Sequence, residues 1–238
     1  MDKCRKGLEY LARKYDISTK KYTLCKNTIK LEDEKEVVLF PWRSERRFTE
    51  LKNLTTNGTM GDISVIRICN INYIDSNIKS LIYRELDLCE IFGGSEIISI
   101  FAVMNDNTAN IIAKLKNDIV CTVEVATTLT KGVDLIDKHE IITTRGICCD
   151  RVVDTQVTQK SIYVFKNNKT PETYLDTDFE LYGLDPNEVT NVRSAFEILK
   201  NEKYADELIA RDKVLNKLVE IAIKSAKSCK NILVEDEK

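Results

Sequence analysis

The stretch SLIYRELDLCEIFGGSEIISIFAVM, Ser80–Met104, reads as a helix, a Gly-Gly stop and an apolar strand. In the helix expected over 76–92, apolar side chains recur at the three- and four-residue spacing of one helical face. They are Ile78, Leu81, Ile82, Leu86, Cys89 and Phe92. Gly93 and Gly94 suit a C-terminal cap, where a left-handed residue is needed. The stretch predicts a helix packed on a core and followed directly by a strand.

Strand patterns surround this helix. ISVIRICNINY (63–73) alternates and is rich in β-branched residues, which is typical of a strand. Other strands are expected at 36–40, 96–104, 109–116, 119–127, 138–145, 161–165 and 231–235, and helices at 1–16, 44–56 and from Asn187 onward, capped by Asp185 and Pro186. Short polar turns within 96–127 favour antiparallel meander pairing. The expected fold class is α+β, an open, mostly antiparallel sheet with helices packed on one face.

Composition narrows the class of protein. The chain has 238 residues, of which 43% are hydrophobic and 31% charged, with a net charge of −2. This balance weighs against nucleic-acid binding, which needs a basic excess. No apolar run approaches the length of a transmembrane helix, and the start has no signal-peptide core. We therefore expect a cytoplasmic protein with no membrane association.

The number and spacing of the cysteines and histidines limit the metal-binding and catalytic chemistry that the chain can perform. Eight cysteines form no C-x-x-C motif, and His139 is the single histidine, so no metal site is predicted. The neighbours Cys148 and Cys149 should point to opposite faces of a strand. His139 opens a predicted strand, where a lone histidine is more often a surface or edge residue than a catalytic base. The basic segment RSERRF (43–48) reads as a solvated face, with anion binding as the alternative.

Several segments together resemble the C-terminal domain of the Gfo/Idh/MocA oxidoreductases, the glucose-fructose oxidoreductase and inositol dehydrogenase group. They are VVLFPWRSERRFTELKNLTTNGTMGDISVIRI, IIAKLKNDIVCTVEVATTL, KHEIITTRGI and ELIARDKVLNKLVEIAIKSAKSCKNILVE. The resemblance covers 36–238. It implies that 36–238 is the oxidoreductase C-terminal-like domain and that 1–35 is an N-terminal helical extension or a remnant of a Rossmann domain.

The chain departs from that family where the family's chemistry lies. It has no G-x-G motif, so we expect no dinucleotide bound by this chain alone; NAD(P) would need a Rossmann partner. Asn27 stands at the position of the family's catalytic lysine. Ser80 and Arg84 stand at the positions of its Asp-His pair, and neither can perform that proton transfer. Arg84 and Asp87 are expected to pair on the surface.

Three functions stay open. The first is a non-catalytic, oxidoreductase-derived domain that forms a homo-oligomer through its sheet face. The second is the substrate-binding subunit of a split NAD(P)-dependent oxidoreductase, completed by a Rossmann-type subunit. The third is a small-molecule binding module. Candidate ligand- or partner-binding residues are Trp42, Arg43, Ser80, Arg84, Asp87 and His139.

Overall fold

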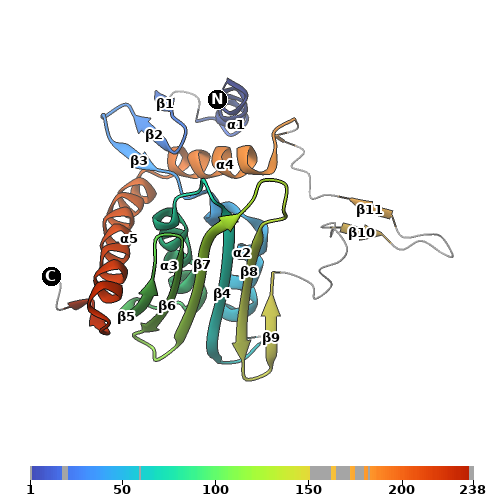
Figure 1. Ribbon diagram of the computed structural model, residues 1–238. Coiled ribbons are helices and arrows are strands. Elements are labelled where there is room, and N and C mark those ends of the chain that lie inside the picture. The colour runs from blue at the N-terminus through green and yellow to red at the C-terminus, as the bar shows by residue number, and fades with distance from the viewer. Residues whose placement is uncertain are drawn as a thin grey trace. The chain divides into compact units, whose positions relative to one another are not determined.

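The computed structural model describes residues 2–17, 21–58, 60–150, 162–164, 172–174, 180, 181 and 183–235 (Figure 1). Contacts divide the chain into two compact units. One comprises Met1–Glu45 and Val152–Ile209, and the other comprises Arg46–Arg151 and Ala210–Lys238. The family resemblance predicted a domain boundary at residue 35, and that boundary stays a prediction.

The first unit is built on two helices and a small sheet. Its elements are α1 (Asp2–Lys14), β1 (Tyr22–Leu24), β2 (Thr28–Leu31), β3 (Glu36–Val38), the 3-10 helix η1 (Pro41–Ser44), β10 (Ile162–Val164), β11 (Glu172–Tyr174), α4 (Pro186–Lys200) and the start of α5 (Glu202–Ser228). Strands β1, β2 and β3 form an antiparallel meander. The predicted cap of α4 is confirmed, because Asp185 and Glu188 form a capping box with Pro186 in the first turn. Strands β1 and β2 were not expected from the sequence.

The second unit is a seven-stranded sheet with helices α2 (Arg46–Thr56) and α3 (Ile78–Gly93). Its strands are β4 (Ile63–Tyr73), β5 (Ile97–Met104), β6 (Thr108–Leu115), β7 (Val120–Leu129), β8 (Ile136–Thr143), β9 (Gly146–Cys149) and β12 (Ile232–Leu233). Their order is β12-β5-β6-β7-β4-β8-β9. The meander β5-β6-β7 is antiparallel as predicted, whereas β4 and β7 pair in parallel. The predicted α+β class with a mostly antiparallel sheet is confirmed.

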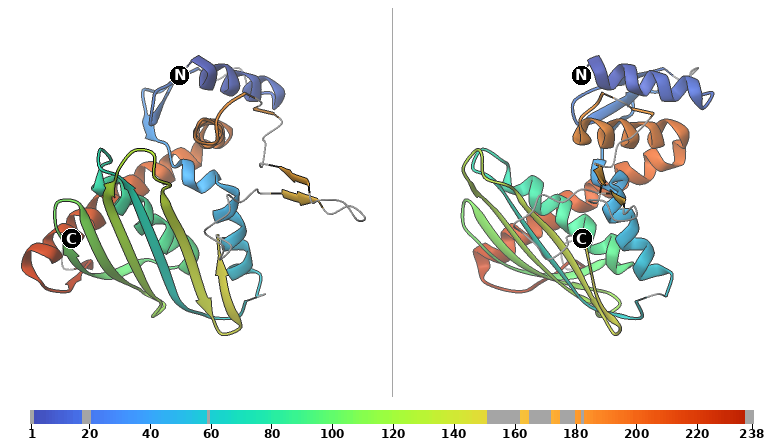
Figure 2. Two further views of the ribbon diagram at one scale, coloured as in Figure 1. Left: turned by 45° about the vertical axis from the view of Figure 1, so that its right-hand side comes forward. Right: turned by 90° about the vertical axis from the view of Figure 1, so that its right-hand side faces the viewer.

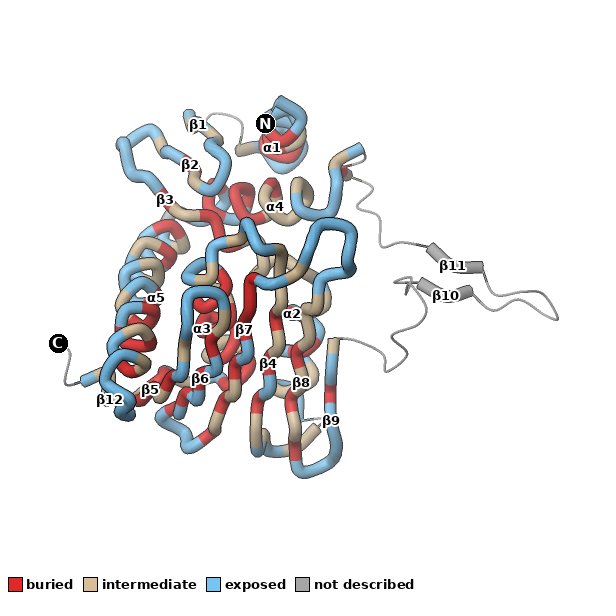
Figure 3. Tube along the Cα trace, viewed as in Figure 1, coloured by how far each residue is buried: buried red, intermediate tan, exposed pale blue. Residues whose placement is uncertain are grey.

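Helices α2 and α3 cover one face of this sheet (Figure 2). The C-terminal part of α5 joins them, since the Ser225 hydroxyl accepts a hydrogen bond of 2.9 Å from the Ala102 backbone N–H of β5. Strand β6 shows the two-sided pattern, since buried and exposed residues alternate along it (Figure 3). Ala109, Ile111, Ala113 and Leu115 are buried, and the residues between them are exposed. We call the other face of the sheet, turned away from α2 and α3, the open face.

Adjacent residues of β9 confirm this alternation. Cys148 is buried and Cys149 is exposed, as expected for neighbours on a strand. All eight cysteines are free thiols. Among the helices that the structure describes, none combines the length and the apolar character that crossing a bilayer requires.

The end of α3 depends on two glycines for different reasons. Gly94 has φ +64° and closes the helix in the left-handed conformation, as predicted. A Cβ on Gly93 would lie 2.1 Å from Leu115 Cδ1, a buried side chain of β6. Gly93 is therefore what allows the last turn of α3 to lie directly on the sheet.

We expect Gly93→Ala to lower the free energy of unfolding by about 1–2 kcal/mol, because Leu115 must leave its position in a packed core. Gly94→Ala should cost about 1 kcal/mol through backbone strain alone, since no atom lies within 4 Å of its Cβ position. Shortening Leu115 to Val should recover stability in the Gly93→Ala background and not in the Gly94→Ala background. Urea unfolding followed by circular dichroism measures both, and equal effects of Leu115→Val in the two backgrounds would contradict the packing argument.

Candidate functional site

His139 is buried at the centre of a charged cluster between the sheet and its helices. It lies on β8, between β4 and β9, and its side chain is 0% exposed. The expectation of a surface or edge residue is therefore wrong. The physical reason is strand parity, because His139 shares the helix-covered side of β8 with Ile141, which is also fully buried.

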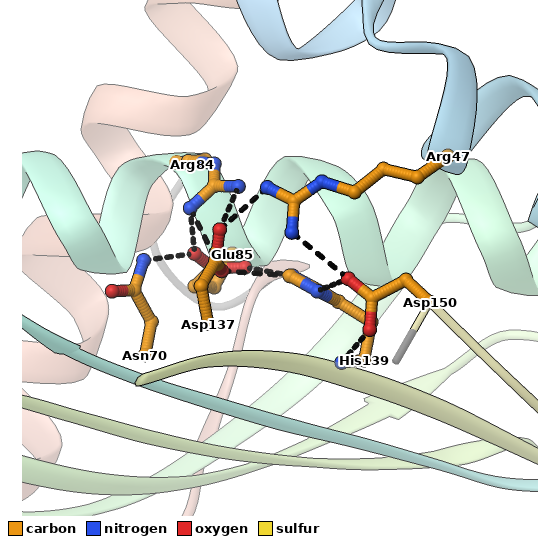
Figure 4. Close-up of polar contacts among 7 residues, drawn as sticks. All are labelled: Arg47, Asn70, Arg84, Glu85, Asp137, His139 and Asp150. Atoms are coloured by element: carbon orange, nitrogen blue, oxygen red, sulfur yellow. Dashed lines mark hydrogen bonds and ion pairs between the residues drawn. The ribbon is translucent and has the colours of Figure 1, made fainter. Parts of the chain in front are cut away.

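Both ring nitrogens of His139 contact carboxylates (Figure 4). Nδ1 lies 2.7 Å from Asp150 Oδ2, and Nε2 lies 3.0 Å from Glu85 Oε2. The side chains of Glu85 and Asp150 are themselves 0% exposed. Asp150 also accepts a 2.8 Å hydrogen bond from the backbone N–H of His139, which fixes the carboxylate against β8.

Glu85 brings helix α3 into the cluster. Its Oε1 accepts hydrogen bonds from Asn70 Nδ2 on β4 at 2.7 Å and from Arg84 Nη1 at 3.1 Å. Arg84 also donates to both oxygens of Asp137 on β8, at 3.2 and 3.0 Å. The Asp137 carboxylate thus forms a bidentate, charge-assisted pair of hydrogen bonds with the Arg84 guanidinium.

Arg47 brings helix α2 into the cluster. Its guanidinium contacts Asp137 and lies 3.1 Å from Asp150 Oδ2. The ring of Phe48 packs edge-on against His139, with centroids 4.6 Å apart, and the Arg47 guanidinium lies 4.2 Å from the centre of the same ring. The interpretation of RSERRF as a solvated face is therefore wrong for Arg47, which joins α2 to the sheet. We call Arg47, Asn70, Arg84, Glu85, Asp137, His139 and Asp150 the His139 cluster.

The cluster is balanced in charge when His139 is protonated. Burial alone would lower the pKa of His139, but hydrogen bonds to Asp150 and Glu85, together with their negative charges, raise it to about 9. Burial would likewise raise the pKa of Asp137, and the charges of Arg84 and Arg47 outweigh it and hold that pKa well below its usual range. At neutral pH, three carboxylates therefore face two guanidinium groups and one imidazolium.

This arrangement leaves His139 no free lone pair. A general base or a metal ligand needs an unprotonated ring nitrogen, and both nitrogens here donate to buried carboxylates. Ligand atoms of Glu85, Asp137 and His139 lie within 4.8 Å of one another, which by donor type could suit a divalent cation. The carboxylates are already neutralised by Arg84 and Arg47, however, so the donor set does not fit a metal ion. The geometry favours a structural role.

A second buried ion pair joins α3 to α5. Asp87, whose side chain is 0% exposed, accepts a 2.7 Å hydrogen bond from Arg211 Nε, and the same guanidinium contacts Glu90. The neighbouring Tyr83 hydroxyl donates to Asp212 at 2.8 Å. The expected surface pair of Arg84 and Asp87 is therefore wrong, because the two side chains leave α3 in different directions and serve separate ion-pair groups.

The other candidate residues lie apart from the His139 cluster. Ser80 is exposed in the first turn of α3, where its backbone N–H donates to the Asn77 carbonyl. Trp42 and Arg43 belong to η1 in the first unit, and both contact Phe40, with the Trp42 ring centre 5.2 Å and the Arg43 guanidinium 4.9 Å from that ring. Of the six candidates, the structure brings together Arg84 and His139, both bound to Glu85.

Sequence reasoning missed Glu85, Asp137 and Asp150. A signal for Glu85 existed, since it lies three residues after Ile82 and four before Cys89, on the edge of the predicted apolar face. A signal for Asp137 existed as well, because it shares strand parity with Ile141. Neither spacing reveals which charges meet, because Glu85 and His139 are 54 residues apart.

No protein-family model matches the sequence, and no curated protein matches it. Solved structures do match. Scyllo-inositol dehydrogenase from Lactobacillus casei, solved with bound cofactor NAD(H) and scyllo-inositol, aligns with a TM-score of 0.56 and 16% identity over 82% of this chain and 64% of its own. Myo-inositol dehydrogenase from Corynebacterium glutamicum aligns with a TM-score of 0.58 and 11% identity over 82% and 63%. Myo-inositol 2-dehydrogenase from Lactobacillus plantarum aligns with a TM-score of 0.56 and 15% identity over 82% and 63%.

These likenesses establish the fold. The chain has the fold of a part of these dehydrogenases, which is the fold that the family resemblance implied. It spans between 62% and 65% of the length of the dehydrogenases it matches. At identities of 17% and below, the match concerns architecture alone.

Proposed function

We propose that this chain is a non-catalytic, oxidoreductase-derived domain that self-associates through its open face. The observation that carries the proposal is a set of large apolar side chains exposed on that face. They are Val103 on β5 (63% exposed), Ile112 on β6 (45%) and Ile147 on β9 (60%). Val103 and Ile112 lie on the paired strands β5 and β6, and Ile147 lies at the far edge of the same face. Contiguous exposed apolar side chains are a mark of association surfaces.

The state of the charged groups supports the non-catalytic part of the proposal. By the family resemblance, Arg84 stands where a proton-transferring histidine would be. Arg84 is committed to Asp137 and Glu85 and stays protonated at any working pH. His139, the single imidazole of the chain, is saturated by its two carboxylates. No described histidine is thus free to act as a base.

The charges on the open face favour binding of a second copy of the chain. Arg67 and Glu140 form an exposed ion pair of 3.5 Å, and Glu124 and Lys138 lie beside them on the neighbouring strands β7 and β8. A face that carries both signs of charge among apolar residues can be complementary to itself, which an isologous dimer requires.

We expect Ile112→Asp to shift the protein from dimer to monomer. The substitution places a charge on the exposed apolar surface beside Val103, where desolvation of that charge opposes association. The measurement is sedimentation velocity over a range of micromolar concentrations. Val214→Asp is the matched control, because Val214 is 46% exposed on α5 and lies away from the open face. A wild-type chain that stays monomeric at high micromolar concentration, or equal effects of the two substitutions, would contradict the proposal.

A further inference from the structure

The open face is organised in rows that run across the strands. Strand pairing aligns β7, β4 and β8 residue by residue, so side chains on this face form four successive rows. The first row contains Val120, Val65 and Ile142; the second contains Thr122, Arg67 and Glu140; the third contains Glu124, Cys69 and Lys138; the fourth contains Ala126, Ile71 and Ile136. On these three strands the outer two rows are apolar, and the inner two are polar.

Charges alternate along the inner rows. The second row carries a positive charge on β4 and a negative charge on β8, and the third carries a negative charge on β7 and a positive charge on β8. Glu124 and Lys138 form no ion pair with any residue that the structure describes, so both charges are available to a partner. Cys69 lies between them, and burial, with the charge of Glu124 next, raises the pKa of its thiol and keeps it neutral.

We infer that two copies meet about a two-fold axis that runs across the strands, between the row of Arg67 and the row of Cys69. The inference rests on the proposed self-association and specifies its geometry. This axis places the first row of one copy over the fourth row of the other, so that apolar side chains face apolar side chains. It also places Glu140 over the partner's Lys138 and Arg67 over the partner's Cys69.

The competing axis runs along β4. It would place Glu124 over the partner's Lys138, but it would also place Arg67 directly over the partner's Arg67, where two like charges oppose each other at the centre of the interface. The axis across the strands brings no like charges together. On the neighbouring strands it also places Phe101 of β5 over the partner's Val103, since Phe101 pairs with Ile112 in the second row and Val103 with Asn110 in the third.

Charge reversal tests the axis. Glu140→Lys alone and Lys138→Glu alone should each weaken self-association about tenfold or more, because each creates two like-charge contacts across the axis. An equimolar mixture of the two variants should associate nearly as tightly as the wild type, because every contact in the mixed dimer again joins lysine to glutamate. Restoration by mixing cannot come from contacts within one chain. Sedimentation velocity with a fluorophore on one variant measures the mixed dimer.

The matched control is a mixture of Glu124→Lys with Lys138→Glu. If the axis runs across the strands, this mixture should associate no more tightly than Lys138→Glu alone. If the axis runs along β4, the mixture should associate nearly as tightly as the wild type. Circular dichroism and thermal melting of each variant confirm folding. If the wild type dimerises through Ile112 but mixing Glu140→Lys with Lys138→Glu restores nothing, the axis is wrong and the proposed function stands. A monomeric wild type overturns both.

Discussion

Glu85→Gln should lower the free energy of unfolding by about 3 kcal/mol at pH 7. Glutamine keeps the shape of the side chain and removes its charge, which leaves the buried His139 imidazolium and the Arg84 guanidinium with one counter-charge fewer. Breaking a buried ion pair from one side typically costs 3–5 kcal/mol, because the remaining charge stays desolvated. Deprotonation of His139 should relieve part of this loss, so the lower end of the range is expected.

Urea unfolding followed by circular dichroism measures the effect. Glu50→Gln is the matched control, because Glu50 is an exposed glutamate on α2, and its change should lie within about 0.5 kcal/mol of the wild type. If Glu85→Gln were as stable as Glu50→Gln, the three carboxylates would not be holding α2 and α3 on the sheet, and the structural role of the His139 cluster would be wrong.

Stability should fall as the pH rises from 6.5 to 9. The folded-state pKa of His139 is raised to about 9, from about 6.5 in the unfolded chain, so the folded state binds the proton more tightly. The contribution is fully present below pH 6.5 and is lost as the pH passes through 9, about 3 kcal/mol in all. About 2 kcal/mol should already be lost by pH 8.

A single histidine makes this prediction easy to check. Once any affinity tag has been removed, proton NMR of the imidazole reports His139 alone, and its titration midpoint should lie near pH 9. In Glu85→Gln the midpoint should fall, because one of the two carboxylates that raise the pKa is gone. A wild-type imidazole that titrates near pH 6.5 would contradict the arrangement of the cluster.

Local patterns predicted the elements of the second unit well. The strand expected at 63–73 is β4 residue for residue, because its alternation and β-branched content leave few alternatives. The helix expected over 76–92 is α3 to within two residues at each end, and Gly94 caps it as its position after the apolar face required. Each of these signals lies within the element itself.

Long-range features were beyond local patterns. The parallel pairing of β4 with β7 depends on which edge of the meander receives β4, and no local spacing encodes that choice. The prediction of the ion pairs failed for the same reason. Asp87 was expected to meet Arg84 three residues away, yet it meets Arg211 on another helix, 124 residues further along the chain, where no local spacing can indicate the partner.

The parallel contact between β4 and β7 also sets an order of assembly. Val65 pairs with Val120, and at translation rates of roughly 5–20 residues per second, β4 leaves the ribosome several seconds before its parallel neighbour exists. Its other neighbour, β8, is made later still. The meander β5-β6-β7 needs only local closure and can form at once. Nascent β4 therefore has both edges unpaired until β7 and β8 have been made, and unpaired strand edges are where other chains can add.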